Sequence, residues 1–408
     1  MVPKGWMLKQ LSDIVKEKIS YGIVQAGPHI PNGIPYIKSS DIRGAIDPAS
    51  LQRTAPEIHY KYRRSAVHPG DIIFSLRGNI GETAIVPSNL LEANLTQGTA
   101  RISVSGDQCN EFYHQQFAMD KLRNYINSLS KGSTFKEISL EELRKVKVLC
   151  APLPEQKKIA QILSTWDKAI TVTEKLLVNS QQQKKALMQQ LLTGKKRLLD
   201  ENGERFSGEW KRVKLGAIAD MNSGGTPKST VEEYYGGNIP WVSISDMTSN
   251  GKWIATTEKY LTELGLNSSS ARIYPKNSVL YAMYASIGEC SIAAVNLTSS
   301  QAILGIRPKD CLNYEFLYFY LTSLKEKIKL QGQQGTQSNL NAGMVKEFEL
   351  DLPSIREQQK IAAVLSAADA EISTLEKKLA CLRDEKKALM QQLLTGKRRV
   401  KVDEAVAE

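Results

Sequence analysis

The residue types that most often carry catalysis are present in this chain of 408 residues, but they form no catalytic pattern. The histidines lack the short spacing of metal ligands, and all four lie in the first third of the sequence: His29, His59, His68 and His114. The carboxylate pairs Glu141-Glu142 and Glu232-Glu233 are adjacent, which is typical of solvated turns or helix starts and not of an acid/base pair. The sequence therefore predicts no active site of its own, no metal site and no cofactor.

Motifs that bind phosphate or a nucleotide cofactor are absent from the sequence as well. It contains no G-x-G-x-x-G and no G-x-x-x-x-G-K-[ST], and Gly194-Lys195 and Gly251-Lys252 lack the loop and the hydroxyl of a P-loop. An Asn-Pro-Pro-Tyr motif of the kind that amino-methyltransferases use is also missing. The function is therefore expected to be binding, and the next question is which elements position the binding residues.

An internal repeat is the most specific feature of the sequence. The string KALMQQLLTGK occurs at Lys185–Lys195 and again at Lys387–Lys397, a shift of 202 positions. Upstream residues repeat with the same shift, beginning at Glu155-Gln156 and Glu357-Gln358. Because loops tolerate changes in length at little cost, a spacing kept to the residue indicates two rigid elements whose length matters.

Both copies of the repeat have the apolar period of a coiled coil. Apolar residues recur at alternating steps of four and three over about five heptads. The seam contains Ile159, Leu163, Trp166, Leu187 and Leu191 in the first copy and Ile361, Leu365, Leu389 and Leu393 in the second, with Lys184 and Lys386 at matching polar positions. Each helix is expected to follow a Pro-containing segment and to end at a glycine C-cap, Gly194 or Gly396.

The segments that precede the two helices have a different character. They contain short apolar runs between Gly, Pro, Asn and Ser, which predicts mixed α/β domains. A weaker repeat relates the two, for example Ile34-Pro35-Tyr36 and Ile239-Pro240-Trp241. We therefore predict a first domain (1–150), a central helix and linker (151–205), a second domain (206–352) and a C-terminal helix and tail (353–408).

The length of the helices predicts their relative direction. About 38 residues at ~1.5 Å per residue make a rod of about 55 Å. In a parallel pair, the linker of roughly 15 residues would have to return along the whole rod at about 3.3 Å per residue, which it could barely do. The sequence therefore predicts an α+β protein in which two α/β domains are joined by an antiparallel coiled coil with a pseudo-two-fold axis.

Composition is that of a cytoplasmic protein whose charge permits a polyanionic partner. The formal net charge is +11, and the five cysteines are scattered and never form a C-x-x-C pair, which indicates a reducing compartment. No signal peptide begins the sequence, and no segment reaches the roughly 20 apolar residues of a membrane span. A membrane partner is therefore not expected.

The whole chain resembles the specificity subunit of type I DNA restriction–modification systems. The resemblance is carried by the helix pair, with its Glu-Gln starts and its L-L-T-G-K ends, and by GIPYI…SDI, NIPWV…SDM, GGTP and RGNIG, which occur in the family's order. It implies two target recognition domains that read the halves of a split, asymmetric site in double-stranded DNA, and a coiled coil that fixes the spacer between them. It also implies two modification subunits, carrying S-adenosylmethionine, that dock on the helices; an ATP-driven restriction subunit remains an open further partner.

The resemblance makes several polar residues candidates for reading bases. Arg77 lies in a Gly-flanked turn, and Arg is the commonest bidentate reader of guanine, whereas Tyr284 stands at the corresponding place in the second domain. Gln97 and Gln301 match each other and would suit adenine, with a strand-end hydrogen bond as an equal alternative. Further candidates are Lys38, Ser39, Ser243 and Ser245 after the Ile-Pro-aromatic strands and, for phosphates, Ser133, Thr134, Lys136, Thr226, Lys228, Thr336, Gln337 and Asn339.

Two other functions remain open from the sequence. The second domain has no net charge, which would suit a scaffold that binds protein or carbohydrate. A nuclease with an unrecognised carboxylate site is a weaker alternative. The basic clusters after Gly194 and Gly396 would suit either DNA phosphates or the negative ends of the helix dipoles. The positive net charge and the equal register of the two repeats favour DNA.

Overall fold

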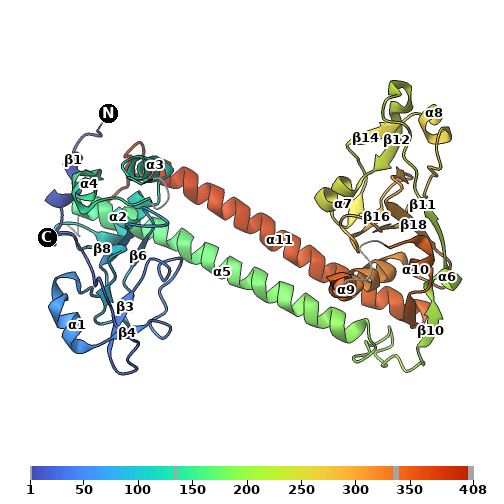
Figure 1. Ribbon diagram of the computed structural model, residues 1–408, viewed down its shortest axis with the longest axis horizontal. Coiled ribbons are helices and arrows are strands. Elements are labelled where there is room, and N and C mark those ends of the chain that lie inside the picture. The colour runs from blue at the N-terminus through green and yellow to red at the C-terminus, as the bar shows by residue number, and fades with distance from the viewer. Residues whose placement is uncertain (1, 133–135, 334–339, 403–408) are drawn as a thin grey trace. The chain divides into compact units, whose positions relative to one another are not determined.

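The computed structural model describes residues 2–132, 136–333 and 340–402. They form two compact units, of which the first comprises Met1–Glu174 and Lys377–Glu408 and the second Lys175–Glu376 (Figure 1). Each unit contains one mixed α/β domain and half of each long helix, α5 (Leu153–Leu191) and α11 (Ile355–Leu393). Among the residues described, no helix is long and apolar enough to cross a membrane.

The N-terminal domain is built on a four-stranded antiparallel sheet of order β2-β8-β5-β6. A second sheet has the order β4-β3-β7, and β1 pairs with β9. The strands are β1 (Met7–Gln10), β2 (Ser20–Tyr21), β3 (Ile34–Ile37), β4 (Arg53–Thr54), β5 (Ile72–Ser75), β6 (Thr83–Ile85), β7 (Asn94–Leu95), β8 (Thr99–Ile102) and β9 (Lys147–Cys150). The helices are α1 (Pro56–Lys61), α2 (Asn110–Phe117), α3 (Asp120–Ser128) and α4 (Leu140–Lys145).

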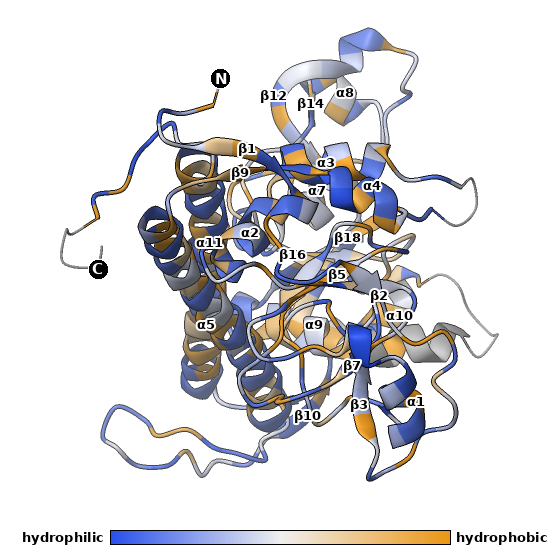
Figure 2. Ribbon diagram, turned by 90° about the vertical axis from the view of Figure 1, so that its left-hand side faces the viewer, coloured by the Kyte–Doolittle hydropathy of each residue, from blue (hydrophilic) through white to orange (hydrophobic). Residues whose placement is uncertain are grey.

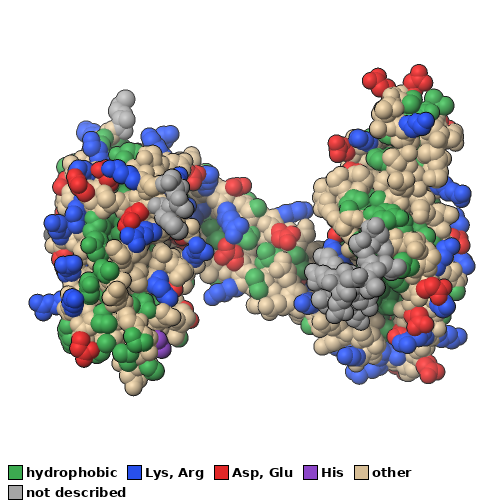
Figure 3. Space-filling model, viewed as in Figure 1, with side chains coloured by type: hydrophobic (Ala, Val, Ile, Leu, Met, Phe, Trp, Pro, Cys, Tyr) green, Lys and Arg blue, Asp and Glu red, His purple; other side chains and the backbone are tan. Residues whose placement is uncertain are grey.

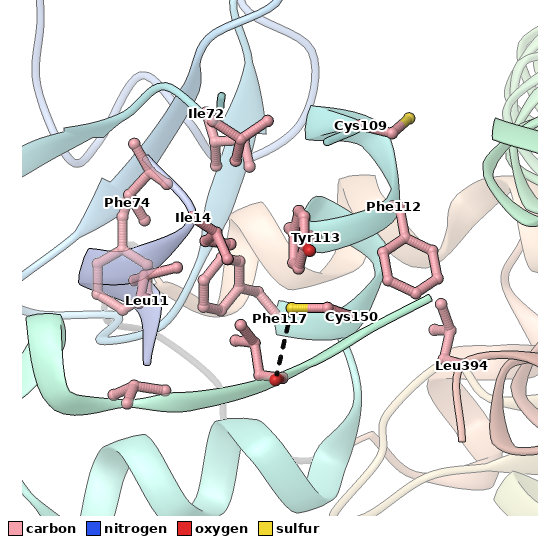
Figure 4. Packing of buried hydrophobic residues seen from close by; sticks show 14 of the residues in the cluster. Leu11, Ile14, Ile72, Phe74, Cys109, Phe112, Tyr113, Phe117, Cys150 and Leu394 are labelled. Atoms are coloured by element: carbon pink, nitrogen blue, oxygen red, sulfur yellow. Dashed lines mark hydrogen bonds between the residues drawn. The ribbon is translucent and has the colours of Figure 1, made fainter. Parts of the chain in front are cut away.

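The core of this domain continues into the two long helices. Phe74 of β5 and Phe117 of α2 are fully buried, with ring centroids 5.5 Å apart. Leu163 of α5 and Leu394, which directly follows α11, belong to the same hydrophobic cluster. Figure 4 shows part of this cluster, with Leu394 below Phe112. The helices are therefore structural parts of the domain as well as connections.

The C-terminal domain contains a five-stranded sheet of order β11-β18-β15-β16-β13, a three-stranded sheet of order β14-β12-β17 and the pair β10-β19. The strands are β10 (Lys211–Lys214), β11 (Ala219–Ser223), β12 (Tyr235–Val242), β13 (Trp253–Ile254), β14 (Lys259–Leu261), β15 (Val279–Ala282), β16 (Cys290–Ala293), β17 (Thr298–Ser299), β18 (Ile303–Pro308) and β19 (Glu349–Leu352). The helices are α6 (Leu215–Ile218), α7 (Ile244–Asn250), α8 (Glu263–Asn267), α9 (Tyr314–Gln333) and α10 (Ala342–Lys346). Leu191 of α5 and Leu365 of α11 lie in the main core of this unit.

The two long helices run antiparallel within the first unit. Lys386 Nζ of α11 lies 2.6 Å from Asp167 Oδ1 of α5, and Arg383 donates to Glu174 at 2.7 Å. Residue numbers rise along α5 as those of their partners fall along α11. The direction predicted from the helix length therefore agrees with the contacts.

The second unit repeats this arrangement with the other halves of the helices. Ser180 Oγ donates to Glu371 Oε1 at 3.0 Å, and Lys184 forms an ion pair with Asp369. Here too the numbers run in opposite directions along the two helices. The mixed α/β domains and the antiparallel helices of the predicted fold are thus present, whereas the pseudo-two-fold axis between whole units stays a prediction.

The predicted seam forms the least exposed stripe of each helix. Thr173 and Leu379, in the middle of the helices, are buried, whereas Val172 and Leu176 beside the seam are 56% and 48% exposed. Figure 2 shows both helices alternating between hydrophilic and hydrophobic residues. The chain leaves each helix through a glycine in the left-handed region, Gly194 or Gly396, both with φ 68°, as predicted for the C-caps.

Candidate nucleic-acid interface

Arg77 lies on the tight turn that connects β5 to β6 in the N-terminal domain. Gly81 N donates to Ser75 O at 3.1 Å, and the Ser75 hydroxyl donates to Arg77 O at 2.9 Å. Gly78 and Gly81 have φ values of 72° and 86°, which residues with a Cβ rarely adopt. The backbone of the turn is thus fixed, and it presents an Arg77 side chain that is 45% exposed.

Glu137 holds the Arg77 side chain from a neighbouring segment. Arg77 Nε lies 2.9 Å from Glu137 Oε2, and Ile138 N donates to Leu76 O at 3.1 Å. Because Nε is engaged, the guanidinium keeps its terminal nitrogens for another acceptor. Glu137 was not among the residues predicted from the sequence, since nothing in its spacing links it to Arg77, 60 positions away.

The C-terminal domain has the same turn between β15 and β16, with a different side chain on it. Gly288 N donates to Ala282 O at 3.1 Å, as Gly81 does in the first domain. Tyr284 occupies the place of Arg77 and is 38% exposed. Ala285 follows it with φ 58°, a conformation in which an L-residue is strained and which is often found at functional sites. The structure therefore supports the predicted equivalence of Arg77 and Tyr284.

Gln97 and Ser39 lie on loops next to the Arg77 turn. Leu76 N donates to Gly98 O at 2.9 Å, which joins the turn to the loop of Gln97. The Ser39 hydroxyl lies 3.9 Å from where a Cβ on Gly98 would stand. Gln97 is half-buried, and its backbone N donates to Ile23 O at 3.0 Å. The structure thus brings three of the candidate base-reading positions of this domain together.

The corresponding loops meet in the C-terminal domain. Met283 N donates to Ala302 O at 2.9 Å, so the loop of the exposed Gln301 adjoins the Tyr284 turn. Gly225 N donates to Ser299 O at 2.9 Å, which brings in the loop of Thr226.

Glycine is required in the Thr226 loop because the backbones approach closely. A Cβ on Gly224 would lie 2.2 Å from Ser299 O, and one on Gly225 would lie 2.1 Å from Ala271 N. The exposed Thr226 and Lys228 therefore stand on a loop anchored to the rest of the interface.

Two predicted contacts after the Ile-Pro-aromatic strands have local structural partners. Ser243 caps α7, where its hydroxyl accepts from Asp246 N at 3.3 Å and donates to the Asp246 carboxylate. In the other domain, Lys38 Nζ donates to Gln52 Oε1 at 3.1 Å, and Asp41 accepts from Lys38 N at 2.9 Å. Ser243 and Asp246 thus serve the helix cap, and Asp41 caps a turn.

Of the remaining polar candidates, two lie in the described part of the chain and five lie outside it. Ser245 and Lys136 are exposed. Ser133, Thr134, Thr336, Gln337 and Asn339 lie outside the described residues. Contacts of these candidates with DNA stay predictions.

Most of the helix residues expected to bind partner subunits are enclosed by the chain itself. The fully or nearly buried ones are Ile159, Leu163, Leu191, Ile361, Leu365 and Leu393, and the half-buried ones are Trp166, Lys184, Leu187, Lys386 and Leu389. A seam pattern cannot distinguish a core shared with the chain's own domains from a face offered to another protein. Any subunit that docks on the helices must therefore meet residues beside this seam.

The basic cluster after each helix contains an arginine that binds a glutamate at the start of the other helix. We call this contact the clasp. Arg197 Nε and Nη2 donate to Glu357 at 2.5 and 2.7 Å, and Trp210 Nε1 donates to the same carboxylate at 3.2 Å. Glu357 is almost completely buried. These arginines were expected to meet phosphates or the helix dipole, whereas the structure gives them a bidentate carboxylate partner.

The first unit contains the same clasp made from the equivalent residues. Arg399 Nε donates to Glu155 Oε2 at 2.8 Å, and Trp6 Nε1 donates to that oxygen at 3.3 Å. Hydrogen bonding to Glu155 raises the pKa of Arg399 above its usual value. The glutamates and arginines repeat with the 202-residue shift, so this signal was present in the sequence.

Among the residues that the structure describes, no group of three or more His, Cys, Asp or Glu side chains could hold a metal ion. Each domain thus carries a turn with the same backbone hydrogen bonds, and the side chains on the two turns, Arg77 and Tyr284, differ. Such an arrangement is suited to reading two different ligands of one chemical kind.

Comparison with protein families identifies the class of molecule to which this architecture belongs. The model of the type I restriction modification DNA specificity domain matches residues 3–179 and again residues 207–382. The two matches cover most of the chain, each including one globular domain and much of a long helix. The chain therefore belongs to the type I restriction–modification DNA specificity family.

Individual relatives agree with this assignment. A type I restriction enzyme MjaIX specificity subunit from Methanocaldococcus jannaschii is 36% identical over 172 residues, which are 41% of the chain and 40% of that relative. The putative MjaX specificity subunit of the same organism is 26% identical over 98% of the chain and 95% of its own length. The S subunit from M. genitalium has the same fold, with a TM-score of 0.63 and 15% identity over 96% of the chain and 99% of its own.

Proposed function

We propose that the chain reads a bipartite, asymmetric DNA site, with one half-site for each domain. The single observation that carries this proposal is the pair of turns around Arg77 and Tyr284, which share their backbone hydrogen bonds but present different side chains. Turns with the same backbone conformation would approach DNA in the same way, whereas different side chains on them would select different bases. The two half-sites therefore differ in sequence, unlike those of a homodimeric reader.

In this proposal the long helices set the distance between the half-sites. Each is a continuous helix of 39 residues, or about 58 Å at ~1.5 Å per residue. Half-sites read from one face of B-DNA lie about 34–36 Å apart, or a multiple of that, which a rod of this length can span. The spacer is then read as a length and not as a sequence.

The catalytic steps belong to other subunits in this proposal. Two modification subunits, which bring S-adenosylmethionine, dock beside the buried seam of the helices, and a restriction subunit is a further partner of the complex. The chain itself contributes the choice of DNA sequence. Docking and recognition would then use different surfaces, so that the site can change without loss of the enzyme partners.

The decisive experiment is sequencing of adenine methylation in DNA from cells that express this chain with the modification subunit encoded beside it. The expected result is one split motif with two unlike halves and a fixed gap. Methylation without a split motif would contradict bipartite reading. A stable complex without any methylation would indicate an inactive or regulatory specificity subunit. No complex and no methylation would contradict the proposed role and favour a scaffold.

A further inference from the structure

A basic groove lies in the first unit between helix α3 and the C-terminal part of α11. Its cavity volume is about 910 Å³. Leu149 of β9 and Ile170 of α5 contribute apolar lining, whereas the basic side chains come from the first turns of α3 and from α11 and the residues after it. The cationic lining residues are Lys121, Arg123, Arg383, Lys386, Lys387 and Lys397, and the acidic one is Asp120.

Half of these cations are neutralised by acidic partners. Lys387 lies 2.8 Å from Asp120, and Lys386 and Arg383 pair with carboxylates of α5. Within the described part of the chain, Lys121, Arg123 and Lys397 form no ion pair. The groove therefore keeps an excess of three positive charges. Figure 3 shows Lys and Arg side chains where the long helices leave this domain.

Arg123 connects the groove to the turn that carries Arg77. Its Cγ lies 3.7 Å from where a Cβ on Gly81 would stand. Its Nε is buried and has no hydrogen-bond partner in the structure, although a buried donor is normally satisfied. The positively charged Arg123, whose Nε–H has no acceptor, thus lies next to the turn that carries Arg77.

The dimensions of the groove suit a chain of phosphates. Its lining on α11 extends from Arg383 to Gln391 and continues to Thr395 and Lys397. The eight steps of helix from Arg383 to Gln391 rise about 12 Å, and each DNA strand carries one phosphate per ~3.4 Å of axis. The groove therefore offers room for about three consecutive phosphates.

We propose that this groove holds the backbone of the DNA beside the half-site that Arg77 reads. The inference rests on the proposed function and adds a second, sequence-independent contact surface to it. Lys121, Arg123 and Lys397 neutralise phosphates, whereas the Arg77 turn reads bases. The groove thereby orients the duplex so that the turn enters at one register.

The position of Arg123 is filled differently in the C-terminal domain. In the C-terminal domain the residue beside the equivalent glycine is Lys325, whose Cγ lies 3.2 Å from a Cβ placed on Gly288. Lys325 forms an ion pair with Glu289, so its charge is already matched. At this one position the charge of Arg123 is free to meet a phosphate, whereas the charge of Lys325 is matched.

The test uses the full chain in its complex with the modification subunit and a duplex that carries the methylated motif. The variant Lys121→Gln with Lys397→Gln changes two exposed side chains and should leave the fold intact. The slope of log K against log salt should become shallower by about two, because each neutralised phosphate contributes about 0.9 to it. Binding should weaken equally for motif and scrambled duplexes, and the methylated motif should stay the same.

The matched control is Lys16→Gln with Lys18→Gln, two exposed lysines in the same domain. Lys16 N donates to Ser103 O, just beyond the end of β8 that is opposite the Gly98 loop. This control should keep the slope of the unchanged protein. An unchanged slope in the groove variant, or equal loss in both variants, would overturn the inference.

Two further results would give the groove or the whole chain a different role. If the groove variant binds DNA normally but loses the modification subunit, the groove is a protein-docking surface and the inference is wrong. If the unchanged complex methylates no split motif, the proposed function fails whatever the groove does. A split motif together with an unaltered salt slope leaves the function standing and removes only the groove.

Discussion

Lys386 of α11 contacts Asp167 of α5 through a 2.6 Å Nζ–Oδ1 ion pair, at the one polar position of the apolar α11 seam. The residues displaced by 202 positions, Lys184 and Asp369, form the same pair in the second unit. A charged position in a coiled-coil seam favours one register over others. The repeat of the sequence is therefore also a repeat of the contacts that fix how the helices align.

We predict a measurable coupling energy between Lys386 and Asp167. The Lys386 side chain is only 15% exposed, so the pair should be worth about 1 kcal/mol, at the upper end for partly exposed pairs. A double-mutant cycle with Lys386→Met and Asp167→Asn, followed by chemical denaturation, measures it. Lys387 and Asp120, both 63% exposed, provide a matched pair that should show no measurable coupling, and equal coupling in both cycles would contradict the assignment.

Arg399→Lys should destabilise the first unit by about 1–2 kcal/mol. Lysine cannot make the bidentate contact with Glu155, and this carboxylate, which is 8% exposed, would lose a charge-assisted hydrogen bond. Thermal unfolding of the variant measures the effect. Arg398→Lys is the matched control, because Arg398 is exposed; a similar loss of stability in that variant would argue against the clasp.

Arg77→Ala should relax the motif at one base position of one half-site. A bidentate contact discriminates against the wrong base by about 1–3 kcal/mol, so the preferred base there should lose about tenfold or more of its advantage in methylation sequencing. Glu137→Gln should act at the same position and more weakly, since it only frees the Arg77 side chain. Asp220→Asn, which breaks an exposed Arg–carboxylate pair in the other domain, should leave both half-sites unchanged.

Seven residues inserted into each long helix at matching positions should lengthen the gap in the motif. One heptad preserves the seam and adds about 10.5 Å, which corresponds to roughly three base pairs at ~3.4 Å each. Both half-sites should keep their sequences, because the domains are unchanged. Methylation sequencing reads the gap directly, and an unaltered gap would refute the helices as the measure of the spacer.

Stability should fall on acidification because of His114. Burial lowers its pKa, with Asp167 and Glu111 opposing the shift and Lys386 adding to it, and its Nδ1 lies 2.8 Å from the Thr83 hydroxyl. A lowered pKa in the folded state means that this contribution is complete above the unfolded pKa, near 6.5, and is lost as the pH falls through the folded pKa. Denaturation between pH 7 and 5 should show a weaker pH dependence for His114→Gln, whereas the exposed His29→Gln should behave as the unchanged protein.

The parts of the molecule that were predictable from the sequence are those with a local period. The seam of α5 and α11 follows from steps of three and four residues, and the direction of the helices follows from their length. The Arg77–Glu137 pair has no such signal, because the two segments lie 60 positions apart and are brought together only by the tertiary fold. The burial of Ile159 and Leu393 in the core of the N-terminal domain was also not predictable from the sequence. A heptad position indicates an apolar contact but not whether the contact is with the other helix, a domain of the same chain or another protein.

The presence of Met390, Leu393 and Leu394 in the core of the N-terminal domain has a consequence for synthesis. Residues 1–150 are synthesised long before these side chains, so the apolar surface that the three residues cover stays exposed in the nascent domain. Contacts of such large sequence separation also slow folding, because the intervening chain must be closed into a loop. The domain that is made first is thus completed last, and a chain cut short before α11 would leave it unfinished.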